Sequence, residues 1–251
     1  EVARNLCLYR YKQLDKAIEN AKKLGFTDGA ALYPMVTMNG EECHNEWEIT
    51  FEEIHRNGAI AFAIYNYIEH TGDYEYVKDY GIHVLIGIAK FWSQRFNWSE
   101  DKKAYVMLGV TGPNEYENNV NNNFYTNYIA KWCIEFTLKT LEEIKLKDQA
   151  HYQKIISETR LTKTELVHLK SMSEAIYFPY SEQHGIYLQQ DGFLDKSMIP
   201  ATEINPKERP INQYWSWDRI LRSPYIKQAD TLQAFYFFED DFSDEILEKH
   251  F

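Results

Sequence analysis

Apolar residues recur at intervals of three and four positions along most of the chain, which places them on one face of an α-helix. The first such run ends at Gly25, a residue typical of helix C-termini. Further runs cover about residues 50–70, 77–92, 125–141 and 226–236. The second and third runs meet at a Thr-Gly-Asp break, which predicts a helical hairpin. The pattern therefore predicts an all-α protein built of paired helices.

Local signals refine the ends of these helices. Thr50 with Glu53 and Thr162 with Glu165 have the spacing of capping boxes, so each pair predicts a helix start. Between about Met172 and Pro224 the helical spacing fails, and this stretch is expected to be a loop with a short strand near residues 185–188. Irregular stretches of this length are commonly functional when they occur inside a compact domain.

Composition narrows the class of protein. The chain has 251 residues, 44% hydrophobic and 16% aromatic, which is sufficient for a sizeable folded core. Its formal net charge of −11 argues against binding to nucleic acid or to an anionic membrane. Cys7, Cys43 and Cys133 lack metal-ligand spacing and predict reduced thiols in core positions. No HExxH pattern occurs among the eight histidines, so no metal is expected.

The main candidate for chemistry is a carboxylate in a turn. Glu115 follows a Gly-Pro turn signal and precedes a predicted helix, and Asn and Tyr residues surround it. Reactive side chains are often placed in this way, on an irregular segment between rigid elements. Neutral amide and hydroxyl groups suit a polyhydroxylated ligand better than a charged one. A single Glu is usually a solvated surface charge, so this assignment depends on the surrounding motif.

That motif resembles the general-acid segment of the disaccharide phosphorylases, the glycoside hydrolase family that includes maltose, trehalose and kojibiose phosphorylases. The matching stretch is GVTGPNEYENN at residues 109–119. Two more stretches are similar to the same family: HNEWEITFEEIHRN at residues 44–57, and KQAD at 227–230 with YFFED at 236–240. The stretches at residues 109–119 and 44–57 are most similar in sequence to maltose phosphorylases. Three separated motifs in the right order are much more specific than one.

The resemblance implies a fold and an assembly. The family's catalytic domain is a toroid of six helical hairpins, so residues 1–251 are expected to form its central part. The family's N-terminal β-sandwich and C-terminal parts are expected to lie outside this chain. The resemblance further implies a cytoplasmic homodimer that uses inorganic phosphate as co-substrate and needs no metal or organic cofactor.

Glu115 is the expected general acid, which protonates the glycosidic oxygen as the bond breaks. An inverting hydrolase needs a second carboxylate to activate water. An inverting phosphorylase does not, because phosphate itself is the nucleophile. A single clear acid motif is therefore compatible with phosphorolysis, although it does not establish it.

The other expected contacts are to the sugar. In the family, the pair Trp47-Glu48 contacts the glucose whose bond is cut, and Lys227-Gln228 holds the same ring. The residue types fit this role, since Trp stacks on a pyranose and Glu, Lys and Gln bond its hydroxyls. The alternative is structural: Trp47 in the core, Glu48 before a helix, and Lys227-Gln228 on a solvated helix face.

The predicted activity is inverting phosphorolysis of maltose to β-glucose 1-phosphate and glucose. Three alternatives stay open. The substrate could be trehalose, kojibiose or nigerose, because the residues that select the second sugar are not readable from the motifs. A glucoamylase-like hydrolase would need the second carboxylate. A non-catalytic sugar-binding protein would tolerate loss of the Glu115 carboxyl group.

Overall fold

The computed structural model describes residues 1–43 and 49–251. The α-helices are α1 (Val2–Lys12), α2 (Leu14–Lys23), α3 (Ile49–Glu52), α4 (His55–Thr71), α5 (Tyr74–Tyr76), α6 (Ile82–Arg95), α7 (Phe124–Lys147), α8 (Gln149–Thr159), α9 (Lys163–Ser173), α10 (Ile211–Tyr214), α11 (Trp217–Leu221), α12 (Thr231–Phe237) and α13 (Asp244–His250). A π-helix, Val77–Gly81, precedes α6, and short 3₁₀ turns lie at Phe193–Asp195, Ala201–Glu203, Pro206–Glu208 and Glu239–Asp241. Strand β1 (Asn97–Ser99) pairs antiparallel with β2 (Ala104–Val106), and β3 (Tyr180–Ser181) with β4 (Ile186–Tyr187).

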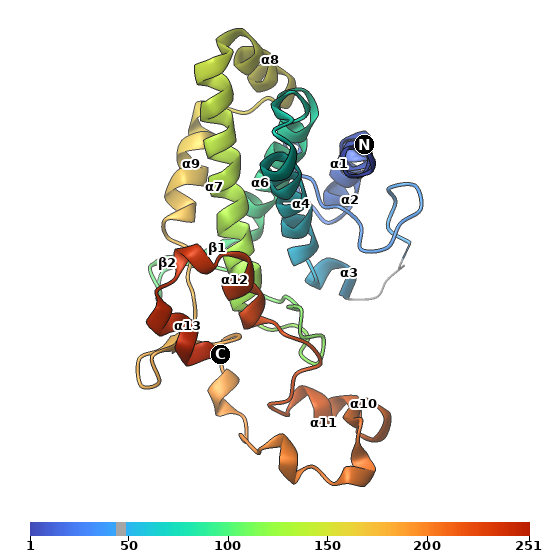
Figure 1. The fold of residues 1–251 in the computed structure, drawn as a ribbon, viewed down its shortest axis with the longest axis vertical. Coiled ribbons are helices and arrows are strands. Elements are labelled where there is room, and N and C mark those ends of the chain that lie inside the picture. The colour runs from blue at the N-terminus through green and yellow to red at the C-terminus, as the bar shows by residue number, and fades with distance from the viewer. Residues whose placement is uncertain (44–48) are drawn as a thin grey trace.

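Helix α7 is the central element of the molecule. It packs against α4, α6, α8, α9 and α12, and α1 and α2 cover the far side of α4 and α6 (Figure 1). The irregular segments that follow β2 and α9 gather toward the lower end of Figure 1, around the start of α7 and beside α10 and α11, whereas the segment after α2 lies to the right of α4. The helices thus form a packed frame, and residues 110–120 and 227–230, which carry two of the sequence motifs, lie together at one end of it.

The core is the apolar seam between these helices. Its largest fully buried side chains include Phe91 and Trp92 of α6 and Phe124 of α7. Burial of a side chain of this size contributes about 2 kcal/mol to folding. Cys7 and Cys133 are buried free thiols, while Cys43 is exposed, so the packing role expected of all three holds only for two. Among the described residues, no helix is long and apolar enough to cross a membrane.

The helix predicted to begin at Thr50 starts differently in the structure. Thr50 lies inside the short α3, and α4 begins only at His55, with Ile54 before it and no side-chain cap. The predicted capping box of Thr50 and Glu53 is therefore wrong. The chain turns between α3 and α4 because Arg56 fastens it, donating to the carbonyls of Thr50 and Glu53 at 2.5 and 2.8 Å.

The helix predicted over residues 226–236 begins later, at Thr231. Residues 226–230 are irregular, and their polar groups bond to another segment: the backbone N–H of Lys227 and the carboxylate of Asp230 both contact Asn114. The capping box of Thr162 and Glu165 is confirmed at the start of α9. The irregular stretch near residues 172–224 is confirmed in outline, with only short strands, 3₁₀ turns and two helices of five residues or fewer.

Candidate active site

The Glu115 carboxylate lies on a loop that is closed at its base. Val110 and Val120 form an isolated antiparallel bridge, with N–H to O=C distances of 2.9 and 2.8 Å in the two directions. We call residues 110–120 the acid loop. A loop closed by backbone hydrogen bonds loses much of its conformational freedom, so its tip is held in place.

Glu52 fixes both ends of the acid loop. Its buried carboxylate accepts from the hydroxyl of Thr111 at 2.7 Å and from the backbone N–H of Asn119 at 2.9 Å. Its backbone carbonyl also accepts from the N–H of Thr111. Hydrogen bonds to a charged acceptor are about twice as strong as neutral ones. The α3 turn is therefore joined firmly to the acid loop.

Asp230 holds the loop from the other side. Its carboxylate accepts from the N–H of Asn114 at 3.0 Å and from the side chain of Asn123 at 2.9 Å. Burial raises the pKa of Asp230 to about 6. Gly112 is required here, because a Cβ atom at that position would lie 2.3 Å from both the Asn123 amide and the Asp230 carboxylate.

The same contact brings the two predicted motifs together. The side-chain oxygen of Asn114 accepts from the backbone N–H of Lys227 at 2.9 Å. The Lys227 ammonium then lies 2.6 Å from Oε2 of Glu115. The side chains are 44% and 31% exposed, so this ion pair faces solvent and is open to a ligand. The predicted acid and the predicted sugar-binding lysine are direct neighbours.

The other predicted sugar contacts are less defined. Gln228 follows Lys227 and is exposed, as a ligand-binding side chain in an open site would be. Trp47 and Glu48 lie outside the described residues.

Three more polar side chains lie at the α3–α4 turn, beside the acid loop. The carboxyl group of Glu53 is buried, and burial together with the negative charge of Glu115 raises its pKa to about 7. Burial lowers the pKa of His55, the first residue of α4, to about 4, so its ring is neutral at pH 7. Arg56 donates hydrogen bonds to three backbone carbonyls, so its role is structural.

Glu117, two residues after the acid, anchors the loop to the irregular segment. It accepts from the side chains of Gln189 and Gln190 and pairs with Lys196. Lys196 also donates to the carbonyls of Leu221 and Ser223. These contacts give Glu117 a structural role in holding the acid loop.

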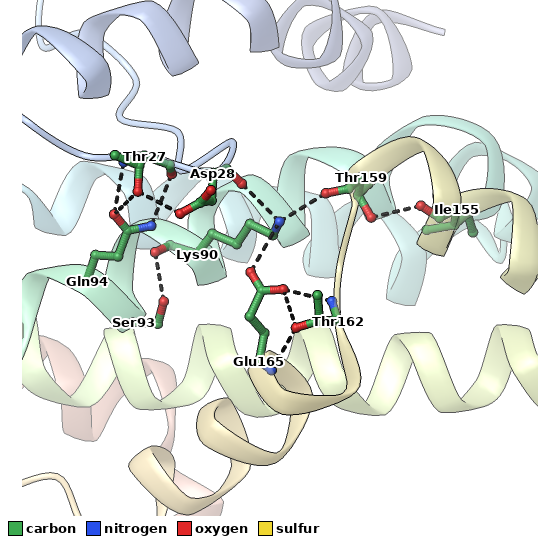
Figure 2. Close-up of polar contacts among 9 residues, drawn as sticks. All are labelled: Thr27, Asp28, Lys90, Ser93, Gln94, Ile155, Thr159, Thr162 and Glu165. Carbon is green, nitrogen blue, oxygen red and sulfur yellow. Dashed lines mark hydrogen bonds and ion pairs between the residues drawn. The ribbon is translucent and has the colours of Figure 1, made fainter.

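A separate groove of about 1030 Å³ lies among α2, α6 and the α8–α9 turn, away from the acid loop. Its buried lysine, Lys90, donates to the carbonyls of Asp28 and Thr159, each at 2.9 Å, and pairs with Glu165 at 3.3 Å (Figure 2). A lysine ammonium has three donors, and all three are used. The contacts of Lys90 in this groove therefore join segments of the fold, and Lys90 has no free donor for a ligand.

Among residues 1–43 and 49–251, no three His, Cys, Asp or Glu side chains are grouped so that they could hold a metal ion. The expectation of a metal-free and cofactor-free reaction stays a prediction.

The site therefore consists of a half-buried carboxylate beside an exposed lysine, at one end of a helical frame (Figure 1). The whole chain, residues 1–251, matches the model of the glycosyl hydrolase family 65 central catalytic domain, and the chain belongs to that family.

Named relatives agree with this assignment. Maltose phosphorylase of Bacillus subtilis (strain 168) is 53% identical over 251 residues, and alpha,alpha-trehalose phosphorylase of Thermoanaerobacter brockii is 35% identical over 259 aligned positions. Both alignments cover all of this chain and 32% of the relative, so the chain spans about a third of the length of these proteins. A solved structure named "Putative kojibiose phosphorylase from human microbiome" aligns over 98% of the chain and 34% of that structure, with a TM-score of 0.88 and 32% identity. The predicted all-α fold, part of the family's helical toroid, is confirmed.

Sequence reasoning missed the roles of Glu52, Glu53 and Asp230. All three lie inside the motifs that carry the resemblance, which was the available signal. Their roles depend on contacts between segments that the sequence does not pair, such as the bond from Asn114 to Asp230 across 116 positions.

Proposed function

We propose that this chain is the central part of the catalytic domain of a disaccharide phosphorylase. The proposed reaction cleaves maltose with inorganic phosphate and gives β-glucose 1-phosphate and glucose. The observation that carries this proposal is the juxtaposition of Glu115 and Lys227, at 2.6 Å, on two segments fastened together by Asn114 and Asp230. A maltose phosphorylase that is 53% identical along the whole chain supports the choice of substrate.

In this mechanism Glu115 protonates the glycosidic oxygen while phosphate attacks the opposite face of the glucosyl carbon. Lys227 and Gln228 hold hydroxyl groups of that glucose, and we propose the same for Trp47 and Glu48. The exposure of the Glu115–Lys227 pair fits this role, because the sugar reaches both side chains from solvent. No metal or organic cofactor enters the reaction, and the phosphate-binding residues are proposed to lie in other parts of the enzyme. The proposed state is a cytoplasmic homodimer.

The test uses the full-length enzyme with maltose, with and without inorganic phosphate, and measures glucose 1-phosphate and its anomer. Phosphate-dependent β-glucose 1-phosphate is the expected product. The variant Glu115→Gln should lower kcat by about 10²–10⁴, the usual contribution of a general acid. Glu142→Gln, on an exposed face of α7, is the matched control and should leave kcat unchanged.

Each rival predicts another product. Glucose released without phosphate would indicate a hydrolase, and unchanged output of the Glu115→Gln variant would indicate a non-catalytic binding protein. Turnover of trehalose, kojibiose or nigerose in place of maltose would keep the mechanism and change the substrate. Size-exclusion chromatography with light scattering tests the homodimer.

A further inference from the structure

Among residues 1–43 and 49–251, Glu53 is a buried acid beside the acid loop whose carboxyl group lacks a full set of hydrogen bonds. The residue is 8% exposed, and its Oε1 atom has no hydrogen-bond partner among the described residues. Its neighbour Glu52 is equally buried but bonds to Thr111 and Asn119. An unpartnered buried acceptor costs about 1–3 kcal/mol, so its retention in this place needs a reason.

The position of Glu53 is fixed relative to the acid loop. Glu52, the residue directly before Glu53, joins α3 to both ends of that loop. On the other side, Arg56 donates to the backbone carbonyl of Glu53 at 2.8 Å. The α3–α4 turn therefore lies against the acid loop, and the charge of Glu115 acts on the Glu53 carboxyl group.

Four charged groups act on Glu53: Glu115, Arg56, Lys227 and Glu52. Arg56 donates its nitrogens to backbone carbonyls, including that of Glu53 itself, and Lys227 is occupied by Glu115. Neither cation makes an ion pair with the Glu53 carboxyl group. Burial and the charge of Glu115 together raise the pKa of Glu53 to about 7, so a proton is present on Glu53 at neutral pH in a substantial fraction of molecules.

This distribution of charge raises a chemical problem that Glu53 solves. A general acid must carry a proton, yet Glu115 is held as the carboxylate partner of Lys227 in the structure. A neighbouring neutral carboxyl group is a source of that proton within the site. When sugar hydroxyls draw Lys227 away from Glu115, the loss of the cation favours transfer of the proton to Glu115.

We infer that Glu53 is the proton store of the active site, which passes its proton to Glu115 as Lys227 turns toward the bound sugar. The O–H bond of Glu53 breaks, the O–H bond of Glu115 forms, and one negative charge moves from Glu115 to Glu53. Glu115 then gives the proton to the leaving glucose. Hydrogen phosphate releases one proton as it becomes the ester, and that proton restores Glu53. This inference rests on the proposed function.

The first test is the pH profile of the full-length enzyme with maltose and inorganic phosphate. The Glu53→Gln variant has no proton to pass on, so Glu115 stays ionised in its pair with Lys227. The alkaline limb of kcat should move to lower pH by about one unit or more, with kcat at pH 7 reduced at least tenfold and KM for maltose within threefold. Glu53→Asp should restore part of the limb, and Glu158→Gln, in the distant groove, should leave it unchanged.

A second measurement does not depend on turnover. Infrared difference spectra between pH 6 and pH 8 should contain the C=O bands of two buried carboxyl groups, Glu53 and Asp230, and Glu53→Gln should remove the band that titrates near pH 7. In Glu115→Gln the band should titrate at lower pH, because the charge that keeps Glu53 neutral is absent.

Three results would overturn the inference. One is a Glu53→Gln variant with an unmoved alkaline limb, which includes a uniform loss of kcat at every pH. The second is an infrared band titrating near pH 7 that survives the Glu53→Gln substitution. The third is phosphate-independent glucose release that disappears in Glu53→Gln, which would make Glu53 a base that activates water. If Glu115→Gln keeps full activity, it is the proposed function that fails, while the infrared result still reports on Glu53.

Discussion

Two lysine–glutamate pairs in this molecule have the same chemistry and opposite surroundings. Lys90 is 4% exposed in its side chain, pairs with Glu165 and gives its remaining donors to two carbonyls (Figure 2). Lys227 is 44% exposed and gives its ammonium to Glu115 alone among the described residues. The first pair is complete without a ligand, and the second is not. The number of satisfied donors, rather than the presence of an ion pair, therefore distinguishes a lysine that only stabilises the fold from a lysine that is open to a ligand.

The glutamates Glu165 and Glu53, one near each lysine, differ in their hydrogen bonds and in their pKa. Glu165 is the partner of Thr162 in a capping box, and although burial opposes it, hydrogen bonds from Thr162 and the nearby Lys90 keep the pKa of Glu165 below its usual range. Beside the other pair lies Glu53, with an unpartnered oxygen and a raised pKa. The fold stabilises the charged form of Glu165 and penalises the charged form of Glu53. Groups left in such an unstable state occur most often at functional sites.

The largest predicted contrast is in activity. Lys227→Met should lower kcat/KM for maltose about 10³-fold, equal to about 4 kcal/mol of transition-state binding, because a charged contact to the sugar is lost. The unfolding temperature should change by less than about 2 °C, since a half-exposed ion pair contributes little to stability. Steady-state kinetics and a thermal melt on the same sample check both. A large loss of stability with unchanged kcat/KM would show that this pair, too, is structural.

The buried pair of Lys90 and Glu165 should affect stability and not activity. Lys90→Met should destabilise the fold by about 3 kcal/mol, because Glu165 and two carbonyls lose their partner in a buried place. Folded enzyme at low temperature should keep its kcat/KM within twofold, since the groove is separate from the acid loop. Chemical denaturation gives the free energy of unfolding. Lys145→Met, which removes an exposed pair with Glu142, is the control and should cost under about 0.5 kcal/mol.

The sequence predicts these two regions unequally well, for physical reasons. The capping box at Thr162 is local: both partners lie within one helical turn, so spacing alone identifies it. The helices follow from their apolar spacing in the same way. The box proposed at Thr50 fails because Arg56, from the next helix, bonds to the carbonyls of that turn and sets its shape. A contact of this kind competes with local preference and is invisible to spacing.

At the site, the motifs predict roles for Glu115 and Lys227 but do not show why the two side chains meet. Their proximity depends on Asn114, whose side chain accepts from the N–H of Lys227, and on Asp230, which accepts from the N–H of Asn114. These bonds also shorten the helix that the apolar spacing predicts from residue 226. The polar groups that hold the site together thus appear in the sequence as ordinary loop residues.

The protonation state of Glu53 makes a prediction of intermediate size. Its pKa is near 4.5 in an unfolded chain and about 7 in the folded protein, so between these values the unfolded chain gives up a proton that the folded protein keeps. Stability from this group therefore falls as pH rises from about 4 to 7. Glutamine carries no charge, so the stability of Glu53→Gln relative to the parent should rise by about 3 kcal/mol between pH 4 and pH 8. Urea unfolding at both pH values measures it.

His55 and Asp230 titrate in the same interval, and they are present in both proteins, so their contributions cancel in the comparison. Glu165→Gln provides the contrast. The pKa of Glu165 is lowered in the fold, so its charge stabilises the protein above about pH 4.5 and this contribution is lost on acidification. Its Gln variant should therefore lose stability relative to the parent as pH rises. Parallel slopes for the two variants would contradict the distinction between the two glutamates.

The smallest predicted effect tests whether the buried pair depends on its cap. Thr162 donates its backbone N–H and hydroxyl to Glu165, each at 2.7 Å, and accepts from the N–H of Glu165 at 3.1 Å. Thr162→Ala removes the hydroxyl contacts and should cost about 1 kcal/mol, the usual contribution of an N-cap. Because Lys90 still holds Glu165, the Lys90→Met and Thr162→Ala effects should not add: the double variant should lose less than the sum, as neighbours in one network do. Strict additivity would mean that the cap and the ion pair act independently, and that Glu165 is held at Lys90 by the ammonium alone.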